Sequence, residues 1–162
     1  MAENPGPGTQ NQTSPGVVDR VADAMLLRTN GHLKGALLMA LVAVAATARK
    51  RYPAGREASD REAFVRFLES AHSVRLSVEF RGDLQPIEHV FYKWFRCELV
   101  HEGDVPYDVE FIDSERLEVR AGGAPEFVLK ISHGWFIHFI GAVVTAPENA
   151  GLFNLGEQDG LS

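Results

Sequence analysis

Residues 91–103 read FYKWFRCELVHEG and combine, near their end, an arginine, the only cysteine of the chain and a histidine. Arg96 carries a permanent positive charge on a planar fork that fits phosphate oxygens. His101 titrates near neutral pH, so it can take up and release a proton. Such a pair is sufficient for RNA cleavage without a metal ion, because the 2′-hydroxyl of the RNA is the nucleophile. The stretch therefore predicts either a phosphodiester-cleaving site or two polar residues at a helix end, where a cation is favoured.

The spacing of the pair sets a geometric condition. Five residues of an ideal α-helix turn the directions of two side chains apart by about 140°. Arg96 and His101 therefore converge only if His101 lies at a frayed helix end, if Arg96 swings around on its long side chain, or if a second copy of the chain supplies one group. A two-fold dimer brings two copies of the motif together, so we expect a homodimer.

Two other kinds of chemistry are less favoured by the residues. The six histidines, at positions 32, 72, 89, 101, 133 and 138, form no H-E-x-x-H motif, and there is no cysteine pair. We therefore expect neither a metal site nor a cofactor. Cys97 precedes His101 by four residues, so a helix would place both on one face, where a thiolate can be stabilised. A single cysteine in an apolar helix is more often a small core residue.

Four neighbours of the pair are candidates for supporting roles, namely Tyr92, Lys93, Cys97 and Glu102. Tyr92 is more typical of a half-buried core aromatic than of a side chain that stacks on RNA. Glu102 either orients the imidazole or remains a solvated charge at the helix end, and we favour the latter.

The segment R-C-E-L-V-H, residues 96–101, resembles the R-x(4–6)-H motif of the HEPN superfamily of helical-bundle proteins. In that family the motif lies at the end of the third main helix. Many members are metal-independent endoribonucleases that act as dimers in toxin–antitoxin, anti-phage or RNA-processing systems. The resemblance implies that Arg96 and His101 are the catalytic pair, that RNA is the substrate, and that an antitoxin or other regulatory partner exists.

One position departs from the family pattern. Cys97 stands where the family commonly has Asn, Asp or His, a polar side chain that helps to orient the site. The alternative is therefore a non-catalytic HEPN-like binding or interaction protein that dimerises through its helical bundle.

Composition limits the class of protein. A chain of 162 residues, 45% of them hydrophobic, fits one domain with a sizeable core. A net charge of −6 argues against a non-specific duplex-binding module. The single cysteine fits a reducing compartment, so we expect a cytoplasmic protein. The uncharged run at 35–48 is shorter than the roughly 20 residues that span a bilayer, which predicts a buried bundle helix and no membrane partner.

The elements around the motif follow from periodicity and from glycine and proline. We expect a mostly α fold, a HEPN-like helical bundle with a small antiparallel β-meander inserted before the last helix. Helices are predicted at 18–51, either unbroken or divided near residue 30, then at 59–72, 86–101 and 135–145. Ser59 lies three residues before Glu62, a capping-box pattern that marks the start of the helix at 59–72. The meander is predicted at 106–132. For 74–80 and 135–145 the pattern leaves helix and strand open.

The ends of the chain differ from its middle in composition. Residues 1–16 are rich in Pro, Gly, Asn, Gln, Thr and Ser, which predicts a disordered tail. Residues 151–162 are rich in Gly and polar residues and are expected to form a flexible tail. The HEPN-like domain is thus predicted at 17–150.

Overall fold

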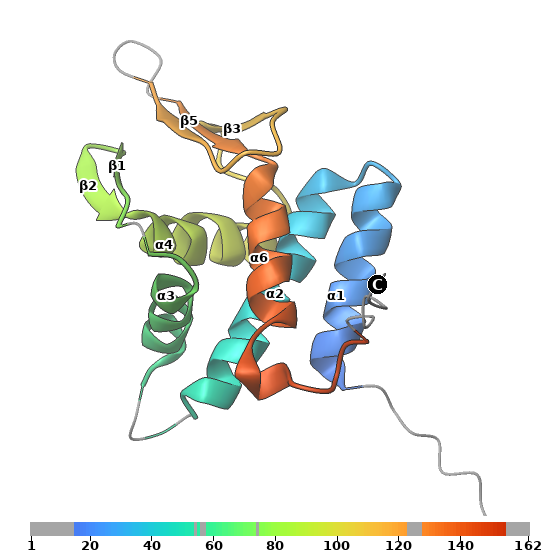
Figure 1. Ribbon diagram of the computed structural model, residues 1–162. Helices are drawn as coiled ribbons and strands as arrows, with labels where there is room; N and C mark the ends of the chain where they lie inside the picture. The colour runs from blue at the N-terminus through green and yellow to red at the C-terminus, as the bar shows by residue number, and fades with distance from the viewer. Residues whose placement is uncertain (1–14, 54, 56–57, 74, 123–127, 155–162) are drawn as a thin grey trace, which may run out of the picture.

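The fold is built mainly from helices, with two small sheets at one end of the bundle (Figure 1). A computed structural model describes residues 15–53, 55, 58–73, 75–122 and 128–154. The helices are α1 (Gly16–Thr29), α2 (Leu33–Arg51), α3 (Asp60–Ala71), α4 (Ile87–Val90), the π-helix η1 (Phe91–Cys97), α5 (Glu98–His101), α6 (Gly134–Val144) and the 3-10 helix η2 (Pro147–Asn149). The strands are β1 (Ser77–Phe80), β2 (Asp83–Pro86), β3 (Val109–Ile112), β4 (Val119–Ala121) and β5 (Leu129–Ser132). The expected mostly α architecture is confirmed, whereas most of the two predicted tails lies outside the described residues.

Helix α2 lies at the centre of the bundle and packs against α1, α3 and α6 (Figure 1). Its side chains are buried on several sides, and Leu41 and Val44 are fully enclosed. The uncharged run at 35–48 is therefore a core helix. In the part of the chain that the structure describes, no helix has the length and apolar character to cross a membrane. Of the two alternatives for 18–51, the divided helix is confirmed, because α1 ends at Thr29 and α2 begins at Leu33. Gly31 at the break has φ +79°, a conformation that glycine adopts readily.

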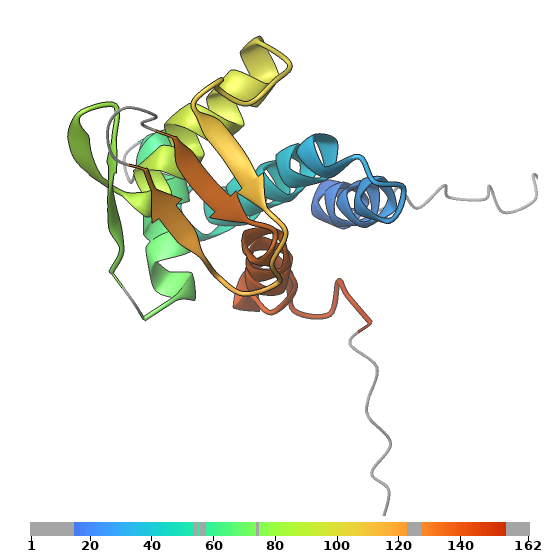
Figure 2. The same ribbon diagram turned by 90° about the horizontal axis from the view of Figure 1, so that it is seen from above.

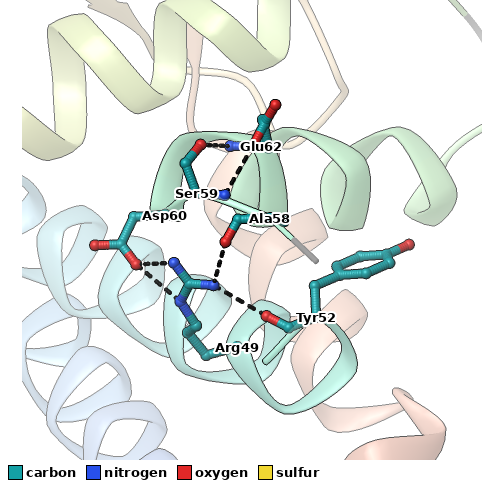
Figure 3. A network of polar contacts seen from close by, with 6 residues as sticks. All are labelled: Arg49, Tyr52, Ala58, Ser59, Asp60 and Glu62. Carbon is teal, nitrogen blue, oxygen red and sulfur yellow. Dashed lines mark hydrogen bonds and ion pairs between the residues drawn. The ribbon is translucent and has the colours of Figure 1, made fainter. Parts of the chain in front are cut away.

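The predicted capping box starts α3 (Figure 3). The Ser59 Oγ accepts a hydrogen bond from the backbone N–H of Glu62 at 3.2 Å, and the Glu62 carboxylate accepts one from the backbone N–H of Ser59 at 2.8 Å. Arg49, near the end of α2, binds the carboxylate of Asp60 and donates to the backbone oxygens of Tyr52 and Ala58. The hydrogen bond from Arg49 lowers the pKa of Asp60. This network fixes the corner between α2 and α3.

Residues 87–101 form one uninterrupted helical segment made of α4, η1 and α5. The predicted helix is confirmed, and Gly103, with φ +74°, follows its end. Its middle part, Phe91–Cys97, is π-helical, a form that is rare and frequently found at functional sites. The segment buries Phe91 and Phe95 completely, so it belongs to the core of the bundle.

The antiparallel meander predicted at 106–132 is wrong in its topology. The strand order is β3-β5-β4, with β3 parallel to β5 and β4 antiparallel to it (Figure 2). The chain after β3 does not form a hairpin with the next strand, because the connection between β3 and β4 is hydrogen-bonded to the residues at the start of α6. There the Gly134 N–H donates to the Ser114 carbonyl at 3.0 Å, and the Ser132 N–H donates to the Glu118 carbonyl at 3.0 Å. These bonds carry β4 to the far side of β5.

Gly134 is required by this close approach. A Cβ atom there would lie 2.3 Å from the backbone oxygen of Arg116 and 2.5 Å from that of Glu115. We therefore expect Gly134→Ala to lower the free energy of unfolding by about 1–3 kcal/mol, the range for overpacking. Gly141→Ala in the same helix is the matched control, because nothing lies within 4 Å of its Cβ position. It should be neutral or stabilising by up to about 1 kcal/mol. Equal denaturation midpoints for the two variants would contradict the close approach.

The two segments for which the pattern allows helix or strand differ in type. Residues 135–144 are helical in α6, and most of 74–80 forms β1, which pairs with β2 as an antiparallel hairpin. At the hairpin turn, Arg81 binds Asp108 through two hydrogen bonds of 2.8 Å. Its guanidinium carbon lies 4.0 Å from the ring centroid of Trp94. Arg81 thus ties the hairpin both to the helical segment and to the loop before β3.

Candidate functional site

Arg96 lies in the π-helical part of the segment and is half-buried. Its Nε and the indole nitrogen of Trp94 are the two buried side-chain polar atoms of the described residues that have no hydrogen-bond partner. The guanidinium carbon lies 5.4 Å from the ring centroid of Tyr92. Arg96 makes a small contribution to the lowered pKa of Asp60, after the larger effect of Arg49. No described carboxylate forms an ion pair with Arg96, so its charge is not neutralised by a direct contact.

His101 is the last residue of α5 and is exposed to solvent. Among the described residues no hydrogen bond joins it to Arg96. The structure therefore places both residues on one helical segment without a hydrogen bond between their side chains. The geometric condition set by their spacing remains a prediction.

The four supporting candidates have different environments. Tyr92 is half-buried and packs against Arg96. Lys93 and Glu102 are exposed, and Cys97 is a half-buried free thiol. Tyr92 is thus the candidate that can orient the guanidinium of Arg96, in agreement with its interpretation as a half-buried aromatic.

A second group of chemically active side chains lies between α3, α4 and α6, where we predicted no site. Glu88 in α4 is only 2% exposed, and its Oε1 lies 2.6 Å from Nε2 of His72. The Nδ1 of His72 lies 3.2 Å from Nε2 of His138 in α6. Trp135 packs edge-on against both imidazole rings. We refer to Glu88, His72 and His138 as the Glu–His–His chain.

His138 also lines a cavity of about 510 Å³ beside α6. The wall is partly apolar, and its other lining residues are Arg51, Phe67, Ser70, Ala71, Gly141, Ala142, Thr145, Ala146 and Pro147. Arg51 is held in place by the Glu148 carboxylate at 2.6 and 3.0 Å and by the Ser70 Oγ at 2.7 Å. The described residues contain no group of three or more His, Cys, Asp or Glu side chains that could hold a metal ion.

The Glu–His–His chain had no signal in the sequence. His72 is 16 positions from Glu88 and 66 positions from His138, and the three side chains come from separate elements. Motif searches depend on fixed local spacing, so they do not find groups that only the tertiary fold brings together. The one local hint is a histidine within the apolar stretch that forms α6.

Burial lowers the pKa of His138, and the nearby His72 lowers it further. In the unfolded chain an imidazole titrates near pH 6.5. Below about pH 6.5 the unfolded state therefore takes up a proton before the folded state does, and the free energy of unfolding falls. We expect the thermal midpoint of the protein to decrease between about pH 6.5 and pH 5, before the carboxylates with lowered pKa values, such as Asp108, begin to be protonated.

His138→Gln should reduce this decrease, because it removes the group whose protonation is opposed in the folded state. His32→Gln, at an exposed histidine, is the matched control and should retain it. A wild-type midpoint that is constant between pH 7 and pH 5 would contradict this assignment.

The fold defines a mostly helical protein with a small mixed sheet inserted before α6. The chain belongs to the Rv1289 family, whose model matches residues 16–157. Comparison with curated proteins and with solved structures gave no match. The family description names no activity, so the function has to be argued from the residues.

Proposed function

We propose that the protein is a metal-independent endoribonuclease of HEPN type that acts as a homodimer. In this proposal the guanidinium of Arg96 binds the scissile phosphate. His101 takes the proton from the 2′-hydroxyl of the RNA or orients that group. The hydroxyl oxygen then bonds to the adjacent phosphorus, the bond from that phosphorus to the 5′-oxygen of the next nucleotide breaks, and the leaving oxygen takes up a proton from water.

The observation that carries the proposal is the unsatisfied guanidinium of Arg96. Its Nε is buried without a partner, whereas Nη1 and Nη2 are not among the buried partnerless atoms and also make no hydrogen bond to the described residues. Both terminal nitrogens are therefore open to solvent. Buried polar groups without partners are few in native proteins, and each one calls for an explanation. An arginine with two free terminal nitrogens matches the geometry of two phosphate oxygens.

The position of His101 supports the same proposal. It is exposed at the end of the helical segment that carries Arg96, so RNA can reach it. Val100, beside it, is an apolar side chain with 59% exposure. A second copy of the chain that packs on this end of the segment would cover Val100 and bring its own motif close to the first. In a toxin or anti-phage setting, an antitoxin or other regulatory partner would cover the same end.

A basic hollow on α3 offers additional contacts to RNA. It is lined by Ser59, Arg61, Glu62, Val65, Arg66 and His89. Here an Arg–His pair is in direct contact, because Nη2 of Arg61 lies 3.2 Å from Nδ1 of His89. Arg66 adds a second positive charge. These groups suit phosphates of the RNA strand outside the scissile position, where arginine positions the backbone without reading sequence.

The test is cleavage of a single-stranded RNA by the purified protein in EDTA. The proposal predicts products that end in a 2′,3′-cyclic phosphate, because the 2′-hydroxyl is the nucleophile. An RNA with 2′-O-methyl groups should remain intact in the same reaction. A strict requirement for a divalent cation, or cleavage of the methylated RNA, would contradict the proposal.

The second candidate is a non-catalytic binding or interaction protein, and exposed apolar side chains favour it. Tyr107 is 94% exposed and Leu84 is 75% exposed. Both β3 and β4 are edge strands of their sheet, and an edge strand can accept a strand from a partner. If the bundle serves only for dimerisation, Val100→Asp should convert a dimer to a monomer in sedimentation equilibrium, and no RNA should be cleaved under any condition.

A further inference from the structure

The side chain of Glu88 is buried, with only 2% of the residue exposed. Burial of a charged carboxylate is costly unless the group is paired and hydrogen-bonded. The 2.6 Å contact with His72 supplies that pairing, and it is short, as expected for a charge-assisted hydrogen bond. The imidazole of His72 is therefore held in a fixed orientation, with its Nε2 toward Glu88.

The contacts of the Glu–His–His chain determine where its protons lie when Glu88 is ionised and both imidazoles are neutral. An ionised Glu88 can only accept, so Nε2 of His72 carries a hydrogen and donates it. In a neutral His72 the Nδ1 is then an acceptor, and the atom that faces it at 3.2 Å, Nε2 of His138, must donate. Neutral His138 therefore has its hydrogen on Nε2 and a free lone pair on Nδ1.

The nitrogen that carries this lone pair is accessible to solvent. The Nδ1 of His138 forms no hydrogen bond with the described residues, and it is not among their buried partnerless atoms. Solvent therefore reaches it, and His138 is one of the residues that line the cavity beside α6. A carboxylate–imidazole–imidazole arrangement that leaves one nitrogen accessible to solvent, on a residue that lines a cavity, suits a general base.

The cavity suits a small organic molecule. Its volume of about 510 Å³ lies within the range of roughly 300–1,000 Å³ that is typical of small-molecule sites. Phe67, Ala142 and Pro147 supply apolar surface. Arg51 also lines the cavity, and its guanidinium is held by the Glu148 carboxylate.

We propose that the Glu–His–His chain is a proton relay that makes Nδ1 of His138 a general base for the hydrolysis of a small ester with an apolar acyl group. Nδ1 takes a proton from water while the water oxygen bonds to the carbonyl carbon. The bond from that carbon to the leaving oxygen then breaks, and the leaving group receives the proton from His138. Water and ester are thus converted to acid and alcohol without an oxidant or a metal ion. The site is separate in its residues from Arg96 and His101.

His138 is the catalytic residue in this proposal, and His72 and Glu88 are positioning residues. His72 holds the ring of His138 through the 3.2 Å contact between its Nδ1 and Nε2 of His138. The Glu88 carboxylate holds His72 in turn, as a buried carboxylate does when it orients a catalytic imidazole.

The first experiment uses the intact protein and p-nitrophenyl butyrate. Saturable hydrolysis is expected for the wild type, and His138→Asn should lower kcat/KM by about 10²-fold or more, as for loss of a general base. His133→Asn is the matched control, because this half-buried histidine at the start of α6 lies outside the relay. Ala142→Phe, which fills the cavity, should also abolish saturable hydrolysis. Hydrolysis that does not saturate, or that survives either His138→Asn or Ala142→Phe, would overturn the proposal.

The positioning role needs a readout that a merely structural role would not change. Glu88→Gln keeps the size of the side chain and removes its charge, so it should move the pH–rate profile to lower pH, because the imidazolium loses its stabilising carboxylate. An unchanged profile would contradict the relay.

Nitrogen NMR of the imidazoles provides a measurement on the wild type itself. At pH 7.5 we expect His138 to be protonated on Nε2 and bare on Nδ1, and the opposite tautomer would overturn the proposal.

Discussion

Replacement of Phe91 by alanine is expected to lower the free energy of unfolding by about 3–5 kcal/mol, the range for removal of a buried phenylalanine. The ring is fully buried. Its centroid lies 4.8 Å from that of Trp135, 4.8 Å from that of Phe139 and 5.4 Å from that of Phe95. The substitution therefore removes the contact between the π-helical segment and α6 and leaves a cavity that the rigid surroundings fill only in part.

Chemical denaturation measures this effect, and Tyr107→Ala is the matched control. Tyr107 is an aromatic residue of similar size that is 94% exposed, so its truncation should change stability by no more than about 0.5 kcal/mol. A loss of less than about 2 kcal/mol for Phe91→Ala, or equal losses for the two variants, would contradict the packing of the helical segment on α6.

His101→Ala is expected to lower the rate of RNA cleavage by about 10²–10⁴-fold, because it removes the group that takes the proton from the 2′-hydroxyl. Arg96→Ala should lower kcat by about 10²–10³-fold, since charge that develops on the phosphate loses its cation. Arg96→Lys should recover only part of this loss, because lysine keeps the charge without the planar fork.

The controls for these variants change residues of the same types at exposed positions elsewhere. His32→Ala and Arg120→Ala should leave cleavage at the wild-type rate. Thermal unfolding of His101→Ala should remain close to that of the wild type, because the side chain is exposed and makes no hydrogen bond with the described residues. Equal loss of cleavage in His32→Ala and His101→Ala would show that the assay does not report on the motif.

Local signals in the sequence were sufficient to predict most helices. The Ser59–Glu62 capping box placed the start of α3, and it is formed as expected. A break near residue 30 was one of the two alternatives for 18–51, and in the structure Gly31 lies at that break with φ +79°. These predictions succeeded because a cap or a break depends on residues within one turn of each other.

Features that depend on distant contacts were not predicted. The order β3-β5-β4 results from hydrogen bonds between the 113–118 connection and the start of α6, where Gly134 permits the close approach. Alternation of apolar residues indicates that a segment is a strand, but it does not indicate which other strands pair with it. The π-helix at Phe91–Cys97 contains neither proline nor glycine, so nothing in its sequence distinguishes it from an α-helix.

The candidate site residues also fall into two groups, those that the sequence predicted and those that it did not. Arg96 and His101 were singled out because they lie five residues apart, and the structure places them in a half-buried and an exposed position of one segment. The Glu–His–His chain was missed because its hydrogen bonds join residues from three elements. Both groups are linked through residues 87–101, which carry Glu88 near one end and His101 at the other. A change in this segment can therefore affect both proposed sites.

A double-mutant cycle of RNA cleavage tests the central claim most directly, namely that Arg96 and His101 act together on one phosphodiester. The cleavage rates in EDTA of the wild type, Arg96→Ala, His101→Ala and the double variant are compared. Residues that act as a unit show strongly non-additive losses. We predict that the double variant is about as slow as the slower single variant. Losses that multiply, or wild-type rates in either single variant, would contradict the claim.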